Sequence, residues 1–302
     1  MIQIEQLTKR YGTFTAVDNI TFTAQTGRIT GFLGPNGAGK STALRMLVGL
    51  TKETSGTARI LGRPFTSLPN PTCDVGVMLD AAAQHPGRTG RETLTMAAIV
   101  VGRGRHEVDG ALERVGLTSR EANRRVRDYS LGMRQRLGLA GALIGDPRVL
   151  ILDEPANGLD PAGIHWMRRL LCDFAAEGGT VLLSSHLLHE IEQIAHDLVM
   201  IGRGRIVAEG STEELVRGGN TLVDSPDRAR LAAVLDRAGL NPSRTPRGGF
   251  VVSATPEQVA SLTLSQQLLI TEIHPAGGGL EEMFLQLTAD DARETITEGQ
   301  AA

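Results

Sequence analysis

Glycine, lysine and serine occur in residues 34–42 at a spacing that could hold phosphate groups. The segment has the pattern G-x-x-x-x-G-K-[ST], in which Lys40 and Ser41 are the last two positions. Glycines let backbone N–H groups turn toward phosphate oxygens, and a lysine neutralises their charge. An apolar run at 29–33 precedes the segment and a helical pattern at 43–48 follows it, which is the context this motif needs. Rather than a glycine turn without a ligand, we predict a phosphate-binding loop made of Gly34, Pro35, Asn36, Gly37, Ala38, Gly39, Lys40, Ser41 and Thr42.

Two carboxylates, Asp153 and Glu154, follow the apolar run at 149–152. Such a run is typical of a parallel strand buried on both faces, and the carboxyl end of such a strand faces the ligand. Asp153 is predicted to join the Ser41 hydroxyl in holding Mg²⁺. Glu154 points elsewhere on the strand end and is predicted to polarise the attacking water. The alternative is that Asp153, Glu154 and Pro155 only open a turn.

Over residues 1–215 the chain resembles the ATPase subunits of ABC transporters, because several motifs follow one another in the order of that family. The loop at 34–42 resembles the Walker A motif, and 149–153 resembles Walker B, with Glu154 as the catalytic glutamate. The segment Tyr129–Met133 resembles the family signature, usually written LSGGQ. The other matches are Tyr11 as the aromatic that stacks on adenine, Val17 as its apolar neighbour, Asn157–Asp160 as the D-loop and His186 as the switch histidine. From the residues alone, Tyr11 could equally be an aromatic at a half-buried strand edge.

The resemblance implies that ATP and Mg²⁺ bind here and that the catalytic residues are Lys40, Glu154 and His186. It also implies that each site is shared between two copies of the chain. Ser130 and the amide of Gly132, at a helix that starts near Met133, would bind the γ-phosphate held by the second copy. The two copies would meet head to tail around two ATP molecules. Ser130 and Asp160 are also residue types that cap helices, and both roles can hold at once.

The chain departs from the family pattern in two places. The signature has Leu131 and Met133 where the family has a glycine and a glutamine, but Ser130 and Gly132, which face the phosphate, are kept. The glutamine that the family usually carries in the Q-loop is replaced by Asp80. We expect Asp80 to ligate Mg²⁺ directly or through water and to couple hydrolysis to the transporter; a surface turn is the alternative. An acidic residue here resembles the subgroup that handles lantibiotics, bacitracin-like peptides and related drugs.

Composition limits the classes of protein that the chain can belong to. The 302 residues carry a formal net charge of −3 and a sequence pI of about 6.2, which argues against a general nucleic-acid-binding protein with a basic face. Cys73 and Cys172 are expected to be free thiols in a reducing compartment. No apolar stretch reaches the roughly 18–20 residues of a membrane-spanning helix, so the membrane path must be a separate permease. We therefore expect a cytoplasmic protein held at the inner face of the cell membrane through that permease.

The predicted fold class is α/β. The resemblance implies a P-loop NTPase of the ABC ATPase type, with a mostly parallel sheet, an antiparallel β subdomain and a helical subdomain. The ATPase domain is predicted over 1–217, with the helical subdomain at about 85–140. A small C-terminal α+β accessory domain is predicted over 218–289, and a disordered tail over 290–302. In the accessory domain, the patterns predict strands from Thr221 and at 249–253, and helices at 228–238, from Pro256 and at 280–287.

The predicted function is ATP binding and hydrolysis that power export of a drug, peptide antibiotic or similar substrate. A non-transport ABC ATPase acting on ribosomes or DNA is the alternative. Such members of the family carry two cassettes or long coiled coils, whereas this chain has one cassette and no heptad run. A degenerate cassette that only senses nucleotide is a third interpretation, against which the presence of Lys40, Asp153, Glu154 and His186 argues.

Overall fold

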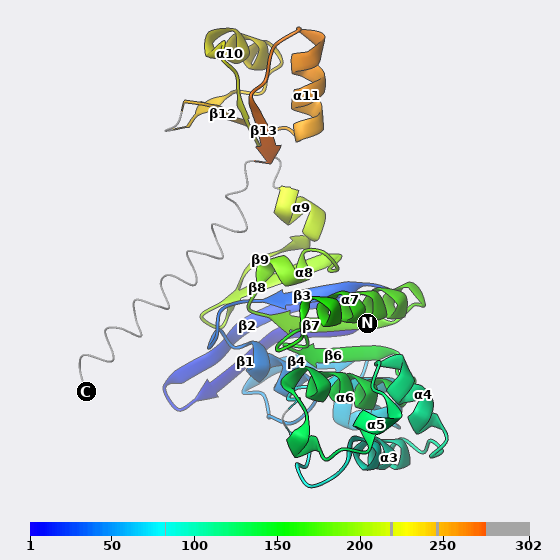
Figure 1. The fold of residues 1–302 in the computed structure, drawn as a ribbon. Coiled ribbons are helices and arrows are strands. Elements are labelled where there is room, and N and C mark those ends of the chain that lie inside the picture. The colour runs from blue at the N-terminus through cyan, green and yellow to red at the C-terminus, as the bar shows by residue number, and fades with distance from the viewer. Residues whose placement is uncertain (82, 218–219, 246–247, 276–302) are drawn as a thin grey trace, which may run out of the picture. The chain divides into compact units, whose positions relative to one another are not determined.

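The computed structural model describes residues 1–81, 83–217, 220–245 and 248–275 (Figure 1). The chain folds as two compact units, Met1–Glu209 and Gly210–Ala302, and each is described by itself. None of the helices within the described ranges combines the length and the apolar character needed to cross a bilayer.

A six-stranded sheet forms the centre of the first unit, in the order β5-β6-β7-β3-β8-β9 (Figure 1). Its strands are β3 (Ile29–Leu33), β5 (Val75–Met78), β6 (Val149–Asp153), β7 (Thr180–Ser185), β8 (Asp197–Gly202) and β9 (Arg205–Ser211). The pairs β5–β6, β6–β7, β7–β3 and β3–β8 are parallel. Strands β3, β6 and β7 are buried almost throughout, which explains their continuous apolar runs. The carboxyl ends of these three strands therefore lie at one edge of the sheet.

A second, antiparallel sheet of three strands has the order β2-β1-β4. It contains β1 (Ile2–Tyr11), β2 (Phe14–Ala24) and β4 (Ser55–Ile60). Apolar side chains of this sheet pack with helix α1 (Lys40–Leu47) and the central sheet in one core. Within that core the rings of Phe22 and Phe32 join the two sheets, with centroids 5.3 Å apart. The core therefore fixes α1 between the two sheets.

A group of helices is drawn below β6 in Figure 1, and one of them contacts strand β5. It contains α3 (Gly90–Val100), α4 (Glu107–Arg114), α5 (Ser119–Ala122) and α6 (Leu131–Leu143). Helix α3 starts in a capping box, because Thr89 and Glu92 each accept a hydrogen bond from the other's backbone N–H. In α4, Val108 and Leu112, four positions apart and so on one face of the helix, are buried. The remaining helices of this unit are α2 (Pro71–Asp74), α7 (Pro161–Ala176) and α8 (Leu188–Ile191).

Helices α6 and α7 touch through a cation–π contact. The guanidinium carbon of Arg136 lies 4.4 Å from the ring centroid of Trp166. Arg136 Nη1 also donates to the carbonyl of Val115 at 2.8 Å, which fixes the guanidinium over the ring. The two helices that begin near the signature and the D-loop are therefore in direct contact.

The second unit contains a four-stranded antiparallel sheet in the order β11-β12-β10-β13. Its elements are α9 (Thr212–Arg217), β10 (Thr221–Asp224), α10 (Arg228–Arg237), β11 (Ser243–Arg244), β12 (Phe250–Val252), α11 (Pro256–Ser265) and β13 (Glu272–Pro275). From β10 to β13 this is the β-α-β-β-α-β arrangement of ferredoxin-like units. Its own core is made of Val223, Leu231, Leu235, Phe250, Val252, Ala254, Val259 and Leu268.

The predicted mostly parallel sheet, antiparallel β part and helical part are confirmed. The strand predicted from Thr221 and the helices predicted from Arg228 and Pro256 are present as β10, α10 and α11. A helix predicted at 280–287 and the disordered tail predicted at 290–302 lie outside the described residues. The limits of the accessory domain, 218 and 289, therefore stay a prediction.

Candidate active site

The predicted phosphate loop connects β3 to α1 and is held by two close backbone approaches. A Cβ on Gly39, whose φ is +106°, would lie 2.4 Å from the carbonyl oxygen of Ala16. A Cβ on Gly34 would lie 2.3 Å from the carbonyl oxygen of Ile201. Only glycine fits at these positions. Gly39 is also the N-cap of α1 and has no side chain to cap the helix, so the first-turn N–H groups are available to an anion.

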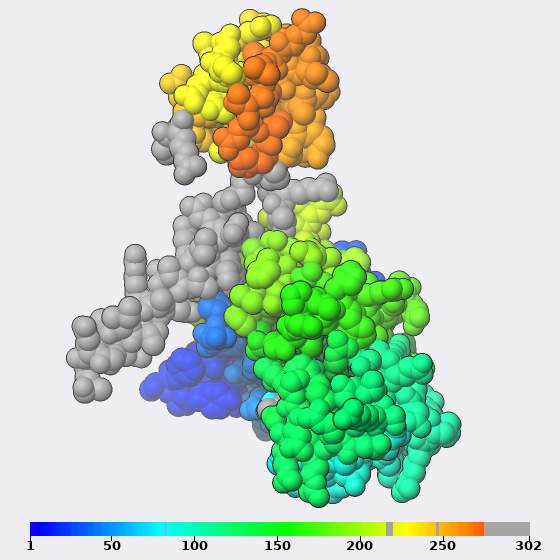
Figure 2. All heavy atoms as spheres, viewed as in Figure 1, coloured from blue at the N-terminus to red at the C-terminus, as the bar shows by residue number. Residues whose placement is uncertain are grey.

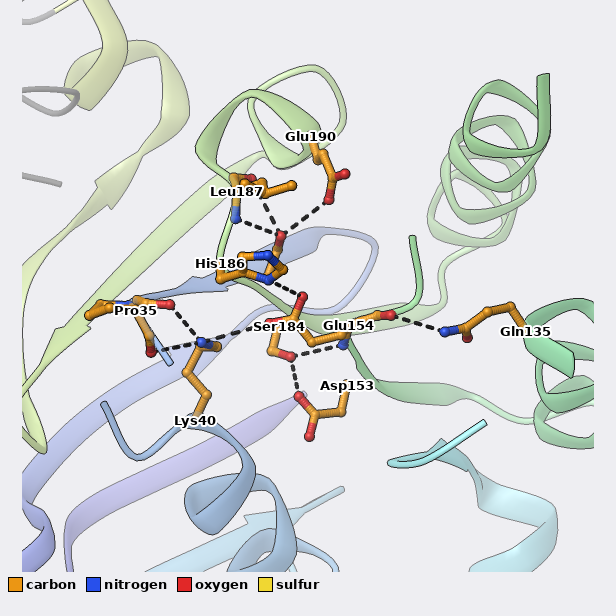
Figure 3. Close-up of polar contacts among 11 residues, drawn as sticks. Pro35, Lys40, Gln135, Asp153, Glu154, Ser184, His186, Leu187 and Glu190 are labelled. Carbon is orange, nitrogen blue, oxygen red and sulfur yellow. Dashed lines mark hydrogen bonds and ion pairs between the residues drawn. The ribbon is translucent and has the colours of Figure 1, made fainter. Parts of the chain in front are cut away.

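Lys40 is buried at the first position of α1, with 6% of its surface exposed. Its Nζ donates to the carbonyl oxygens of Gly34 at 2.5 Å and Pro35 at 3.0 Å, and lies 3.7 Å from Oε1 of Glu154 (Figure 3). Burial lowers the pKa of Lys40, and the charges of Glu154 and Asp153 oppose that effect. The ammonium is thus held in a place where an anion would stabilise it.

Glu154 lies between Lys40 and His186. Its Oε2 is 2.8 Å from Nδ1 of His186, which follows the end of β7 (Figure 3). Its backbone has φ of +50°, a left-handed conformation that costs a residue with a Cβ about 1–2 kcal/mol. The Glu154 N–H donates to Oγ of Ser184 at 3.0 Å, and the Ser184 hydroxyl donates to the carboxylate of Asp153. One serine on β7 therefore orients both acidic residues of β6.

Of the predicted metal ligands, Ser41 offers a hydroxyl in the first turn of α1, and Asp153 offers a carboxylate at the carboxyl end of β6. These are the oxygen donors that Mg²⁺ takes, and it usually needs only one or two carboxylates besides the substrate phosphates. Groups of three or more acidic, histidine or cysteine ligands are absent from the described residues, which is consistent with such a site. Asp80 is exposed two residues beyond the end of β5, and β5 pairs with β6 through Met78 and Leu152. It therefore follows the strand next to that of Asp153.

Ser130 and Asp160 both cap helices. The Ser130 hydroxyl accepts from the N–H of Met133 at 3.2 Å at the start of α6, and Asp160 accepts from the N–H of Gly163 at 2.9 Å at the start of α7. The capping role predicted for each is therefore present. Leu131, at the position of the family glycine, is 48% exposed.

The signature and the D-loop lie against each other at two glycines. A Cβ on Gly158 would lie 2.3 Å from Cδ2 of Leu131, and a Cβ on Gly132 would lie 3.1 Å from the carbonyl oxygen of Gly158. The side chain that distinguishes this signature therefore packs on the D-loop. Gly158 is needed for that approach, and a side chain at Gly132 would force the D-loop to shift by a few tenths of an ångström.

The two residues predicted to contact adenine occupy different environments. Tyr11 is 52% exposed at the end of β1, and Nζ of Lys9 lies 4.7 Å from its ring centroid. Val17 is fully buried. A Cβ on Gly39 would lie 3.3 Å from Val17 Cγ2, so Val17 supports the phosphate loop from beneath. The contact of Val17 with the base therefore stays a prediction.

Sequence patterns do not predict two residues that contact Glu154. Ser184 could have been suspected, because a serine in a buried strand needs a partner. Gln135 carries no such signal. It lies on α6, is 4% exposed, and its Nε2 donates to the backbone carbonyl of Glu154 at 3.4 Å (Figure 3). Only the placement of α6 against the end of β6 reveals it.

Comparisons with known proteins agree with this geometry. The family described as ABC transporter matches residues 17–157. YhcH of Bacillus subtilis (strain 168), an uncharacterized ABC transporter ATP-binding protein, is 36% identical over 97% of this chain and 98% of its own length. The chain belongs to the family of ABC transporter ATP-binding proteins. The bacitracin transport ATP-binding protein BcrA of Enterococcus faecalis is 36% identical over 95% of this chain and 96% of its own length.

A solved structure of a dimeric bacterial ABC transporter cassette is similar to this ABC ATPase with a TM-score of 0.65 and 25% identity. The similarity covers 70% of this chain and 99% of that chain. The predicted family, fold class and activity are confirmed: the protein is the ATP-binding and ATP-hydrolysing subunit of an ABC transporter. The alternative of an ATPase acting on ribosomes or DNA has no support, because these relatives carry transport names.

Proposed function

We propose that this ATPase powers the export of a drug or peptide antibiotic through a separate membrane permease, from the cytoplasmic face of the membrane. Its similarity over nearly the whole chain to a protein named for bacitracin transport supports a cargo of this class. The acidic residue Asp80 in place of the family glutamine supports the same subgroup.

One observation carries the assignment of the catalytic groups: Lys40, Glu154 and His186 meet in a single chain of contacts. Each end of the Glu154 carboxylate is bound by one of the two other residues. A γ-phosphate that entered the loop would compete for Lys40 and for His186, since both can donate to its oxygens. The Glu154 carboxylate would then be released from both partners and could accept a proton from the attacking water. Entry of the γ-phosphate would thus make the Glu154 carboxylate available as the base.

The loop residues 34–42 would hold the phosphates of ATP with backbone N–H groups and Lys40, and Tyr11 would stack on the base. Ser41 and Asp153 would hold Mg²⁺, and Asp80 would ligate it directly or through water. Once bound, that ion supplies positive charge that offsets the charge on the transferred phosphoryl group. The hydroxyl of Ser184 donates to the Asp153 carboxylate and would hold it in one orientation.

A second copy of the chain would complete each site. Ser130 and the N–H of Gly132, at the start of α6, would contact the γ-phosphate held by the partner, with Asp160 of the D-loop nearby. Ser130 is the N-cap of α6 and Asp160 is the N-cap of α7, and the dipole of each helix favours an anion at this end. The half-exposed Leu131 would lie in the contact between the two copies.

The substitution Glu154→Gln tests the assignment. It keeps the size of the side chain but removes the base, so ATP hydrolysis should fall by at least about a hundredfold while ATP binding remains. The variant should also accumulate as a dimer with ATP, measured by light scattering on a sizing column. The matched control is Glu177→Gln, an exposed residue just beyond α7 that touches none of these groups. Full hydrolysis by Glu154→Gln would remove Glu154 from the role of base.

A cell-based experiment tests the cargo. The chain and the permease that co-purifies with it would be expressed in a bacitracin-sensitive host. We expect the wild-type pair to raise the bacitracin concentration that stops growth and the pair with Glu154→Gln to leave it unchanged. Equal sensitivity with both pairs would contradict a bacitracin-like cargo but not the catalytic assignment.

A further inference from the structure

The structure brings Gln135, a residue of the signature helix, into contact with the catalytic strand of its own chain. Gln135 is buried, and its Nε2 donates to the backbone carbonyl of Glu154 at 3.4 Å (Figure 3). Its Oε1 is buried as well and has no hydrogen-bond partner in the described part of the chain. A reversed amide would place Oε1 against the carbonyl of Glu154, so only the present orientation forms a bond. In the described residues, the side-chain amide of Gln135 therefore forms its hydrogen bond through Nε2, to the carbonyl of Glu154.

A buried amide with one unpaired acceptor is a poor choice for stability. An apolar side chain of similar length, such as methionine, would fill the same space without leaving a polar atom unsatisfied. Packing alone therefore does not account for Gln135. The bond to Glu154 is what the amide adds.

That bond acts on a strained residue. Glu154 has a φ of +50°, and such a conformation persists only where several contacts enforce it. Its N–H is held by Ser184 from β7, and its carbonyl accepts from the N–H of Asn157 at 3.2 Å and from Gln135. Gln135 is the contact in this set that comes from α6. A shift of α6 would therefore change the backbone of Glu154 and the direction of its carboxylate.

Ser130 is the N-cap of the same helix. Five positions, or about 7.5 Å along a helix axis, separate Ser130 from Gln135, so the two move together with the start of α6. Under the proposed function, Ser130 contacts the γ-phosphate held by the partner, while Glu154 acts on the ATP held by its own chain. The start of α6 thus lies between the two ATP sites of the dimer.

We infer that Gln135 is a positioning residue that transmits engagement of Ser130 at one ATP site to the backbone of Glu154 at the other. The inference rests on the proposed function for the roles of Ser130 and Glu154. Under this inference, the rate of hydrolysis of the ATP held by one chain depends on whether Ser130 of that chain contacts the ATP held by the partner.

The test is a double-mutant cycle on the full chain, measured as the single-turnover rate of ATP hydrolysis. We expect Gln135→Met to lower this rate by about tenfold, the effect of losing roughly one hydrogen bond, without changing ATP affinity. Thermal stability should not fall, because the unpaired buried acceptor is removed together with the donor. In the Glu154→Gln background, Gln135→Met should still form the ATP-bound dimer. Where Gln135→Met does not fold, Gln135→Asn replaces it, since its shorter amide cannot reach the carbonyl.

The cycle is closed with Ser130→Ala. Independent residues lose activity multiplicatively, whereas residues that act through one another do not. We expect the loss in the double variant Ser130→Ala, Gln135→Met to be well below the product of the two single losses. The matched control is Gln84→Met, because Gln84 Nε2 also donates to a carbonyl of α6, that of Arg134 at 3.2 Å, but does not reach Glu154. In the double variant Ser130→Ala, Gln84→Met, the loss in hydrolysis rate should equal the product of the two single losses.

The outcomes separate the inference from the proposed function. Loss of thermal stability with an unchanged rate in Gln135→Met would show a purely structural residue and overturn the inference. Multiplicative losses for Gln135→Met and Ser130→Ala would overturn it as well, as would an equal departure from multiplicativity with Gln84→Met. In each of these cases Glu154→Gln would still abolish hydrolysis. If Glu154→Gln hydrolysed ATP, the proposed function itself would fail.

Discussion

His186 and Glu154 face each other across the ends of two neighbouring strands, with Nδ1 and Oε2 2.8 Å apart. The parallel pairing of β6 with β7 sets Asp153 opposite Ser184. Glu154, one residue beyond Asp153, and His186, two residues beyond Ser184, therefore leave the sheet at the same edge. The proposed catalytic carboxylate and its histidine are thus brought together by the sheet rather than by a local motif.

Substitution of His186 by alanine should separate binding from catalysis. We expect turnover to fall by about a hundredfold, since the γ-phosphate loses a donor and Glu154 loses its orienting partner. ATP affinity should change by less than about threefold, because the phosphate loop is untouched. Steady-state kinetics together with binding of a fluorescent ATP analogue measure the two quantities. A large loss of affinity with unchanged turnover would contradict this role.

Lys40 should make the stability of the nucleotide-free protein depend on pH. Its pKa in the folded state is lowered by burial below the ordinary value of 10.5. At a pH between the folded pKa and 10.5, the unfolded chain binds more protons than the folded chain, so the free energy of unfolding rises with pH. Below the folded pKa, burial of the ammonium lowers the free energy of unfolding to its full extent. The difference in melting temperature between wild type and Lys40→Met should therefore shift in favour of wild type as pH rises toward 10.5. A difference independent of pH would contradict the buried ammonium.

Loss of the Ser184 hydroxyl should affect both acidic residues of β6. Ser184→Ala leaves the N–H of Glu154 without its partner and frees the Asp153 carboxylate, at a cost of about 1–3 kcal/mol in the free energy of unfolding. We also expect the Mg²⁺ concentration needed for half-maximal hydrolysis to rise. Ser185→Ala is the control, because Ser185 bonds to Glu190 and Leu187 instead. An unchanged Mg²⁺ requirement would mean that Ser184 does not orient Asp153.

Gly158→Ala should disturb the contact between the D-loop and the signature. The residue has φ of +74°, and its new Cβ would overlap the Leu131 side chain. Strain and overlap together should cost about 2 kcal/mol in the free energy of unfolding. Adding Leu131→Ala should recover the part due to overlap and leave the part due to φ. A double variant no more stable than Gly158→Ala alone would show that Leu131 does not restrict this loop.

Local patterns predict the parts of the site that lie within one segment. The phosphate loop, the carboxylates after β6 and the histidine after β7 could all be placed at strand ends, because buried parallel strands have a recognisable composition. The burial of Val17 could not be predicted, since it depends on how β2 passes beneath the loop. The bonds of Ser184 and Gln135 to Glu154 depend on sheet register and on the placement of α6. In the second unit, the pairing of β10 with both β12 and β13 joins strands far apart in the sequence, so short-range patterns do not predict the sheet order.

The accessible surface of the first unit offers few apolar anchors, and three of them share one helix. Met96, Ile99 and Val100 of α3 are 45%, 59% and 67% exposed. In Figure 2, helices α3 to α6 form a continuous part of the surface at this end of the first unit. Helix α3 packs on the signature helix α6, and its exposed side, with Met96, Ile99 and Val100, is accessible to another protein.

The stacking of Arg136 on Trp166 gives the molecule an internal optical probe. The chain contains one tryptophan, and it lies where α6 meets α7. Its emission depends on the charge held over its ring, so any movement between the two helices changes the fluorescence of a single known position. A change in the contact between these two helices can thus be followed in unlabelled protein, in real time, with no chemical modification of the chain.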